Sequence, residues 1–228
     1  MADLDHCREF GEILETLPFW PQLSEEESDL LRRSCNLRHF KKDTVIHGYE
    51  EECLGMIRVA SGMLRVAIIS EEGREITLLR VSVGEYCVLS AACMIHQITF
   101  NTQITAEDDT DLLVINTAAF KWLTERNVYA RCFMYELFTE HFSEVMWTME
   151  QILFMGYDKR LALFLAEEWE RTGSPKLHMT HEQIARNTGS AREVVSRMLR
   201  RFAEDGIVSI SRGNIFLKDP EKLKNLTV

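Results

Sequence analysis

Long apolar runs are missing from this sequence of 228 residues. No stretch approaches the ~18 consecutive apolar residues that a membrane-spanning helix needs. The opening residues, MADLDHCREF, are acidic and have neither the basic start nor the apolar centre of a secretory signal. We therefore expect a cytoplasmic protein with no membrane partner.

Clustered cysteines and histidines are missing as well. The cysteines never form a CxxC pair, which favours buried thiols over a disulfide framework in a reducing compartment. There is no H-x-H motif, and His39, His47 and His96 are far apart, which disfavours a metal enzyme built on a cupin-like barrel. We expect no catalytic residues and no metal site. The six cysteines are Cys7, Cys35, Cys53, Cys87, Cys93 and Cys132.

Positive charge is scarce overall but unevenly distributed. The net charge is −10, yet residues 1–156 hold 13 basic against 26 acidic side chains, whereas residues 157–228 hold 13 against 10. A surface that binds phosphates is therefore expected in the C-terminal third. The acidic remainder discourages unselective attachment to nucleic acid.

The first half of the chain predicts a helical start followed by an antiparallel β domain. Residues to about Leu37 have a helical pattern, with Ser24 and Glu27 spaced as a capping box. Short β-rich runs separated by turn residues then recur every 8–12 residues, which is typical of a jelly roll or barrel. These runs are Thr44–Ile46, Met56–Val59, Met63–Ile69, Glu75–Val81, Phe100–Thr105 and Leu112–Ile115.

A long helix is predicted from Asn127 to Met155, a stretch without glycine or proline. One apolar edge has the 3-4 spacing of a coiled-coil seam. A second edge consists of Met134, Leu137, Met146 and Leu153. One edge is expected to contact the β domain and the other a partner helix, although a core helix within one subunit is the alternative. The seam residues, the expected dimer interface, are Tyr135, Phe138, Phe142, Val145, Met149 and Ile152.

Two short helices joined by a tight turn are predicted between Thr180 and Ala203. Thr180 with Gln183, and Ser190 with Glu193, have the spacing of capping boxes, and Gly189 between them suits a left-handed turn. Ile184, Ala185, Val195, Met198 and Leu199 are expected to pack the helices together. This is the pattern of a helix-turn-helix, although a merely structural helix pair has the same periodicity.

A wing should follow the second helix, because Ile207–Ile210 and Ile215–Leu217 flank the turn Arg212-Gly213-Asn214. The start of such a helix reads base edges in the major groove, where arginine suits guanine and glutamate suits cytosine. Glu193 has the further option of serving only as the cap partner of Ser190. The expected base-reading residues are Arg192, Glu193, Ser196 and Arg197, and the expected phosphate contacts are Thr180, Ser190, Arg200, Arg201 and Arg212.

Two segments carry a resemblance to a known family: FKKDTVIHGYEEECLGMIRVASGMLRVAIISEEGREITLLRVSVGE and SAREVVSRMLRRFAEDGIV. The chain resembles the CRP/FNR transcription regulators over nearly its whole length, and Glu193 to Arg197 match the E-x-x-S-R string of the FNR side. The resemblance implies an α+β fold: a β-roll sensor domain of the type that binds cyclic nucleotides (residues 1–126), a dimerisation helix (127–156) and a winged helix-turn-helix (157–228). It also implies a homodimer on double-stranded DNA, RNA polymerase as a partner and control by a small effector.

The sequence departs from the pattern of cyclic-nucleotide responders. Gly84 and Glu85 are present, but the stretch that supplies the Arg-Ser pair in those relatives reads TFNTQITA, and no arginine occurs between Arg80 and Arg126. A buried cyclic phosphate would lack its charge partner, so cyclic AMP is not the expected effector. A solitary Cys7 excludes an N-terminal iron–sulfur cluster.

The sequence does not identify the effector or a cofactor. Cys87 lies close to where haem-binding relatives place a thiolate ligand, so haem or thiol-based sensing is one hypothesis, against ordinary buried cysteines. A regulator without any effector is another. The expected effector pocket consists of Gly84, Glu85, Cys87, Ser90, Cys93 and His96.

Overall fold

A computed structural model of the protein describes residues 13–48, 54–89 and 102–226. The chain divides into two compact units: one comprises Met1–Ile68 and Leu78–Val145, and the other Ile69–Thr77 and Met146–Val228. The first unit is rich in antiparallel sheet and the second is mainly helical. The α+β fold predicted from the sequence is confirmed.

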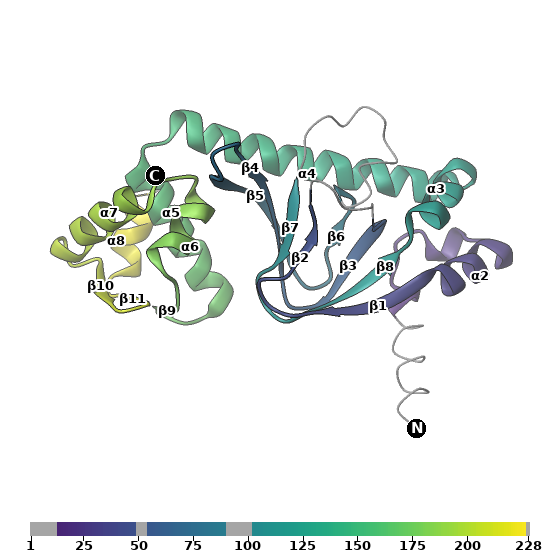
Figure 1. Ribbon diagram of the computed structural model, residues 1–228, viewed down its shortest axis with the longest axis horizontal. Coiled ribbons are helices and arrows are strands. Elements are labelled where there is room, and N and C mark those ends of the chain that lie inside the picture. The colour runs from purple at the N-terminus through teal and green to yellow at the C-terminus, as the bar shows by residue number, and fades with distance from the viewer. Residues whose placement is uncertain (1–12, 49–53, 90–101, 227–228) are drawn as a thin grey trace, which may run out of the picture. The chain divides into compact units, whose positions relative to one another are not determined.

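The β-roll of the first unit consists of two four-stranded sheets (Figure 1). One has the order β1-β8-β3-β6 and the other β2-β7-β4-β5. The pairs β1–β8, β3–β8, β3–β6, β2–β7 and β4–β7 are antiparallel. Val59, Leu64, Ile104 and Leu112 come from both sheets and belong to one buried cluster, so the sheets pack face to face. The strands are β1 (Cys35–Phe40), β2 (Val45–His47), β3 (Met56–Ser61), β4 (Leu64–Ile69), β5 (Glu75–Val81), β6 (Tyr86–Cys87), β7 (Gln103–Ala106) and β8 (Thr110–Ile115).

Helices precede and follow the strands of the roll along the chain. The 3-10 helix η1 (Trp20–Gln22) precedes α2 (Glu25–Ser34), and α3 (Thr117–Arg126) leads into α4 (Val128–Phe154). The capping box of Ser24 and Glu27 is confirmed at the start of α2. Phe19, Leu31, Phe120 and Phe133 pack into one cluster, which joins these helices to the roll.

The predicted helical start extends too far. Cys35 to Leu37 belong to β1, which pairs with β8 from Cys35 opposite Ile115 to Phe40 opposite Thr110. The cross-strand pairing of six residues outweighs a weak local helical pattern. Residues 100–101 of the predicted strand Phe100–Thr105 lie outside the described residues, and β7 begins at Gln103.

The second unit contains α5 (Tyr157–Thr172), β9 (Lys176–Leu177), α6 (His181–Thr188), α7 (Arg192–Glu204), β10 (Val208–Ser211), β11 (Asn214–Leu217) and α8 (Pro220–Asn225). The strand order β10-β11-β9 gives a three-stranded wing, of which the sequence predicted only β10 and β11. The sequence also missed α8, although Asp219 caps it and Pro220 occupies its first position.

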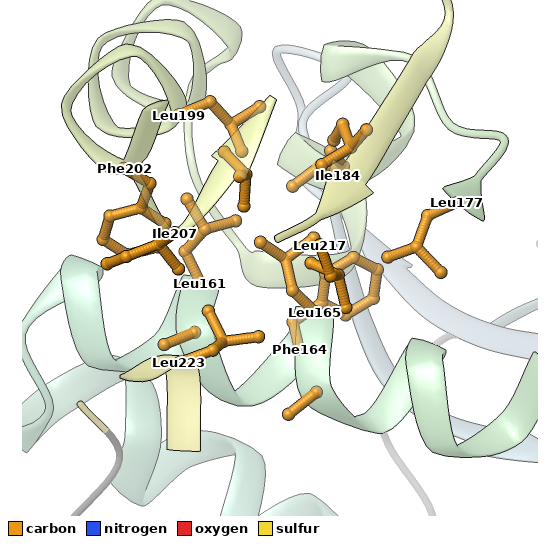
Figure 2. Packing of buried hydrophobic residues seen from close by; sticks show 14 of the residues in the cluster. Leu161, Phe164, Leu165, Leu177, Ile184, Leu199, Phe202, Ile207, Leu217 and Leu223 are labelled. Atoms are coloured by element: carbon orange, nitrogen blue, oxygen red, sulfur yellow. The ribbon is translucent and has the colours of Figure 1, made fainter. Parts of the chain in front are cut away.

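One apolar cluster joins all of these elements. Figure 2 shows Leu161 and Leu165 of α5 pointing toward Ile184, Leu199, Phe202 and Leu217 from the surrounding elements. These side chains are at most 7% exposed. Because this cluster fixes α6 and α7 against α5, the side chains on the opposite face of α7 are presented by a rigid support.

Candidate DNA-binding interface

The first helix of the motif, α6, begins as predicted at the cap residue Thr180. The Thr180 hydroxyl accepts from the backbone N–H of Gln183 at 3.1 Å, and the Gln183 side chain accepts from the backbone N–H of Thr180 at 2.8 Å. Two otherwise unpaired backbone donors are thereby satisfied. The start of α6 is fixed in place beside the wing.

The turn between α6 and α7 depends on Gly189. Its φ of 59° lies in the left-handed region, and its backbone N–H donates to the carbonyl of Ala185. An added Cβ would also lie 3.3 Å from Cδ1 of Ile152. The predicted role of Gly189 in a tight helix–helix turn is confirmed.

The predicted capping box of Ser190 and Glu193 is wrong. The cap of α7 is Ala191, which makes no side-chain cap hydrogen bond. The backbone N–H of Ser190 donates to Ala185 at 2.9 Å, so Ser190 still closes the end of α6. The hypothesis that Glu193 serves only as the cap partner of Ser190 fails with it, and Glu193 is an exposed acidic residue in the first turn of α7.

The α7 helix has two contrasting faces. Val195, Leu199 and Phe202 are buried against the cluster of the second unit, as expected for the first two, and Met198 is partly buried there. The opposite face carries Arg192, Glu193, Arg197, Arg200 and Arg201, all exposed. These arginines take no part in the apolar packing of the second unit. Exposed arginines along one face are what a helix needs to contact phosphates and bases.

Ser196 differs from its neighbours because it is half-buried and already has a partner. Its Oγ lies 2.7 Å from Nδ1 of His181, at the start of α6. Burial, and after it the positive charge of Arg192, lower the pKa of His181. The sequence reasoning missed His181; its position directly after the cap residue Thr180 was the available signal.

A groove of about 670 Å³ separates the wing from the start of the two helices. Thr180, His181 and Arg192 line it from the helices, and Arg212 and Asn214 from the wing. Arg212 is exposed beside Gly213, whose φ is 71°. Cationic groups and a helix N-terminus converge there, a combination that suits an anion such as a phosphate.

The residues expected to form an effector pocket are only partly described. Ser90, Cys93 and His96 lie outside the described residues. Gly84 and Glu85 form a turn in which the Glu85 carboxylate accepts from the backbone N–H of Ser82 at 2.7 Å. Cys87 is fully buried on β6 and interacts with His141 of α4, whose pKa it raises.

His141 is a buried titratable group that the sequence reasoning did not single out. Its Nδ1 lies 3.4 Å from Oε2 of Glu144, one turn along α4. Burial lowers the pKa of His141, but the interactions with Cys87 and Glu144 outweigh that effect and raise the pKa to about 9. At neutral pH, His141 is therefore a positively charged side chain that is buried.

Not all of the cysteines are buried, contrary to the expectation from the sequence. Cys132 on α4 is exposed, and Cys35 is partly buried with a pKa raised by burial to about 12. Cys7, Cys53 and Cys93 lie outside the described residues. Within the described ranges, the structure contains no group of three or more His, Cys, Asp or Glu side chains placed to hold a metal ion, and no helix long and apolar enough to cross a membrane.

The long helix α4 is confirmed over Val128–Phe154. Of its predicted seam, Tyr135, Phe142 and Met149 are exposed, whereas Phe138 and Val145 pack partly against the cores of the first unit and Ile152 is half-buried. The second edge also divides: Met134 and Leu137 are buried, but Met146 and Leu153 are exposed. The predicted separation into one inner and one outer edge is therefore wrong in detail.

Comparison with known proteins matches both halves of the chain. Residues 37–127 match the model of the cyclic nucleotide-binding domain, and residues 159–226 match that of the Crp-like helix-turn-helix domain. A crystal structure of a transcriptional regulator of the crp/fnr family from Eubacterium rectale is 41% identical, with 92% of this chain and 98% of that chain covered and a TM-score of 0.90.

More distant relatives share the fold. The curated Cyclic AMP receptor protein of Thermus thermophilus is 23% identical over 92% of this chain and 96% of its own length. The c-di-GMP responsive regulator CLP of Xanthomonas campestris is 14% identical, covers 86% of this chain and 100% of its own, and has a TM-score of 0.72. These relatives are named for different ligands, so the fold alone does not identify an effector.

Proposed function

Because the chain belongs to the CRP/FNR family of transcription regulators, we propose that it binds an inverted repeat in double-stranded DNA as a homodimer. The observation that carries this proposal is the division of α7 into a buried apolar face and an exposed face with Arg192, Arg197, Arg200 and Arg201. Two such helices would enter successive major grooves about one helical turn apart, ~34 Å.

Different positions on α7 are assigned different roles. Arg192, Glu193 and Arg197 lie at or near the start of the helix, where side chains reach base edges, and Ser196 lies beside them. Arg200, Arg201 and the wing residue Arg212 are assigned to phosphates, together with Thr180 at the start of α6 and Ser190 in the turn before α7. RNA polymerase as a further partner rests on the family likeness alone.

The experiment that tests this assignment starts from duplexes selected from a random library with the purified protein. Binding is then measured by fluorescence anisotropy at fixed salt. Arg197→Ala should lose roughly 1–3 kcal/mol of discrimination at one base position of each half-site. Arg201→Ala should weaken binding to all duplexes alike.

Lys224→Ala is the matched control, because Lys224 lies on α8 and pairs with Glu170 of α5 at 3.0 Å instead of facing the groove. It should bind like the wild type. If Arg197→Ala and Arg201→Ala also bind like the wild type, the proposed DNA-contacting face is wrong.

The dimer is proposed to form along the exposed apolar side chains of α4. Tyr135 is 57% exposed, Phe142 65% and Leu153 64%, and Met149 is a further exposed apolar side chain of the same helix. Large apolar side chains in such density on one helix are typical of an interface rather than of a free surface. The half-buried seam residues Phe138, Val145 and Ile152 would then pack behind these exposed side chains.

The effector is proposed to differ from cyclic AMP. Arg80 is the last arginine of the sequence before Arg126. Its Nε lies 2.8 Å from the Glu107 carboxylate, so its charge is already paired. A cyclic phosphate would have to displace that partner. Thermal unfolding with added cyclic AMP should show no increase in melting temperature; a stabilisation that saturates with ligand would contradict the proposal.

A thiol- or haem-based sensor is retained as a second candidate, because Cys87 and His141 are both buried and interact with each other. The absorbance spectrum of freshly purified protein tests for haem directly. Quantitative alkylation of thiols before and after mild oxidation, with Cys87→Ser for comparison, tests for redox sensing.

A further inference from the structure

His181 and Ser196 form a bridge between the two helices of the motif. Nδ1 of His181 lies 2.7 Å from Oγ of Ser196, and His181 also lines the groove beside the wing. In the described part of the chain, the structure gives Nε2 of His181 no hydrogen-bond partner. One nitrogen of the ring therefore holds a proposed base-reading hydroxyl, and the other has no partner among the described residues.

The direction of this hydrogen bond depends on the proton state of the imidazole. A neutral ring with its proton on Nε2 accepts at Nδ1, so the Ser196 hydroxyl must donate to it and presents only lone pairs outward. A charged ring donates from both nitrogens, so Ser196 accepts and its own proton is free. The third form, neutral with the proton on Nδ1, would turn the lone pair of Nε2 toward a bound phosphate and is disfavoured.

We propose that His181 is a proton-linked positioning residue, whose charge decides whether Ser196 presents a hydrogen-bond donor to a DNA base. This inference rests on the proposed function of α7. When His181 is charged, Nε2–H donates to a DNA phosphate in the groove and the freed Ser196 proton can reach an acceptor such as guanine O6 or N7 or thymine O4. When His181 is neutral, that donor is lost.

The charges around the groove make the two states respond to DNA. The charged side chains that line it are Glu182 of α6, Arg192 of α7 and Arg212 of the wing. Without DNA, burial and Arg192 lower the pKa of His181. A phosphate adds negative charge beside the ring and favours the imidazolium, so the pKa rises on binding.

The sign of the effect follows from linkage. Because the complex holds the proton more tightly than the free protein, DNA binding takes up as much as one proton per subunit. Affinity is therefore highest at low pH and falls as the pH rises through the pKa of the bound state. Each subunit contributes one His181, so this loss is limited to about tenfold per pH unit for each subunit and about a hundredfold for the dimer.

The test uses the full chain and a duplex selected by the wild type. Dissociation constants are measured from about pH 6 to about pH 8.5 at constant ionic strength. Wild type should weaken severalfold across this range, His181→Gln should lose that dependence, and His181→Arg, with a fixed charge, should stay tight throughout. His178→Gln is the matched control, because His178 is exposed in the same unit and should behave as wild type.

Calorimetry in two buffers of different ionisation enthalpy gives the protons taken up on binding. Wild type should take up protons near neutral pH, and His181→Gln should not. Ser196→Ala should keep the uptake, because the phosphate contact remains, but lose the pH dependence of base preference at the position contacted by Ser196.

The outcomes separate the two proposals. If wild type binds DNA and His181→Gln has the same pH dependence, the inference is wrong and the DNA-binding function stands. If wild type binds no duplex at any pH, the proposed function fails and the inference fails with it.

Discussion

The side-chain amide of Asn127 donates to Oε2 of Glu27 at 3.1 Å, and the same oxygen accepts from the backbone N–H of Ser24 at 2.8 Å. At its other end, Oδ1 of Asn127 accepts from the backbone N–H groups of Tyr129 and Ala130. One buried side chain therefore caps α4 and ties its start to the start of α2.

Replacing Asn127 with alanine should lower the free energy of unfolding by about 2–3 kcal/mol, because the cap of α4 and the partner of Glu27 are removed together. Urea denaturation measures this value. Asn36→Ala is the control: Asn36 is exposed and its side chain accepts from Arg38 at 3.2 Å, so its removal should cost less than about 0.5 kcal/mol. Equal destabilisation in the two variants would contradict the capping role.

Local signals in the sequence predicted those helices whose ends are capped by residues at or next to the ends themselves. Thr180 with Gln183 closes the start of α6, and Gly189 closes its end, so both boundaries were readable from residue types. The wrong prediction of a capping box at Ser190 also came from such a local signal. A serine three residues before a glutamate satisfies the spacing of a capping box, but the turn needs the Ser190 backbone to close α6 instead.

Pairing between distant segments could not be predicted in the same way. The strand Cys35–Phe40 exists because β8, about 75 residues later, lies opposite it. The short β9 has only two residues and depends on β11 for its partner. The His181–Ser196 hydrogen bond and the interaction between Cys87 and His141 likewise join residues that only the folded chain brings together.

The charge on His141 should make stability depend on alkaline pH. The folded-state pKa of about 9 lies above the ordinary 6.5, so the stabilisation is complete below about pH 6.5 and is lost as the pH rises through about 9. The free energy of unfolding of wild type, relative to His141→Gln, should therefore fall between these limits. The measurement is urea denaturation at several pH values.

His178→Gln is the control for this dependence, because His178 is exposed and should leave the pH profile of wild type unchanged. Glu144→Gln should weaken the dependence, since Glu144 is one of the partners that raise the pKa of His141. A difference between wild type and His141→Gln that stays constant with pH would show that His141 is not charged in the folded protein.

The exposed aromatic side chain of Phe142 should be essential to the dimer. Phe142→Glu places a charge on a residue that is 65% exposed in the single chain, so it should produce folded monomers that lose tight binding to an inverted repeat. Sedimentation velocity and circular dichroism measure assembly and folding. Phe142→Leu keeps an apolar side chain and should remain dimeric; monomers of Phe142→Glu that bind the repeat as tightly as wild type would contradict the proposed assembly.

The wing residue Arg212 should contribute affinity without selectivity. It is exposed in the turn between β10 and β11 and faces the same groove as Arg192, a position suited to a phosphate contact. Arg212→Ala should weaken binding to specific and unrelated duplexes by the same factor. It should also reduce the slope of log affinity against log salt by about 2 for the dimer, because one phosphate in each of the two half-sites is no longer neutralised by an arginine.

Anisotropy titrations across a series of salt concentrations measure this slope. Lys218→Ala is a useful comparison, since Lys218 is an exposed cation directly after β11 that does not line the groove, and its removal should change the slope little. Removing a phosphate-binding side chain weakens binding to every sequence alike, whereas removing a base-reading side chain changes the preference at one position. A weakening in Arg212→Ala that depends on the duplex sequence would therefore move Arg212 from the phosphates to the bases, and would require the wing to lie in a groove instead of on the backbone.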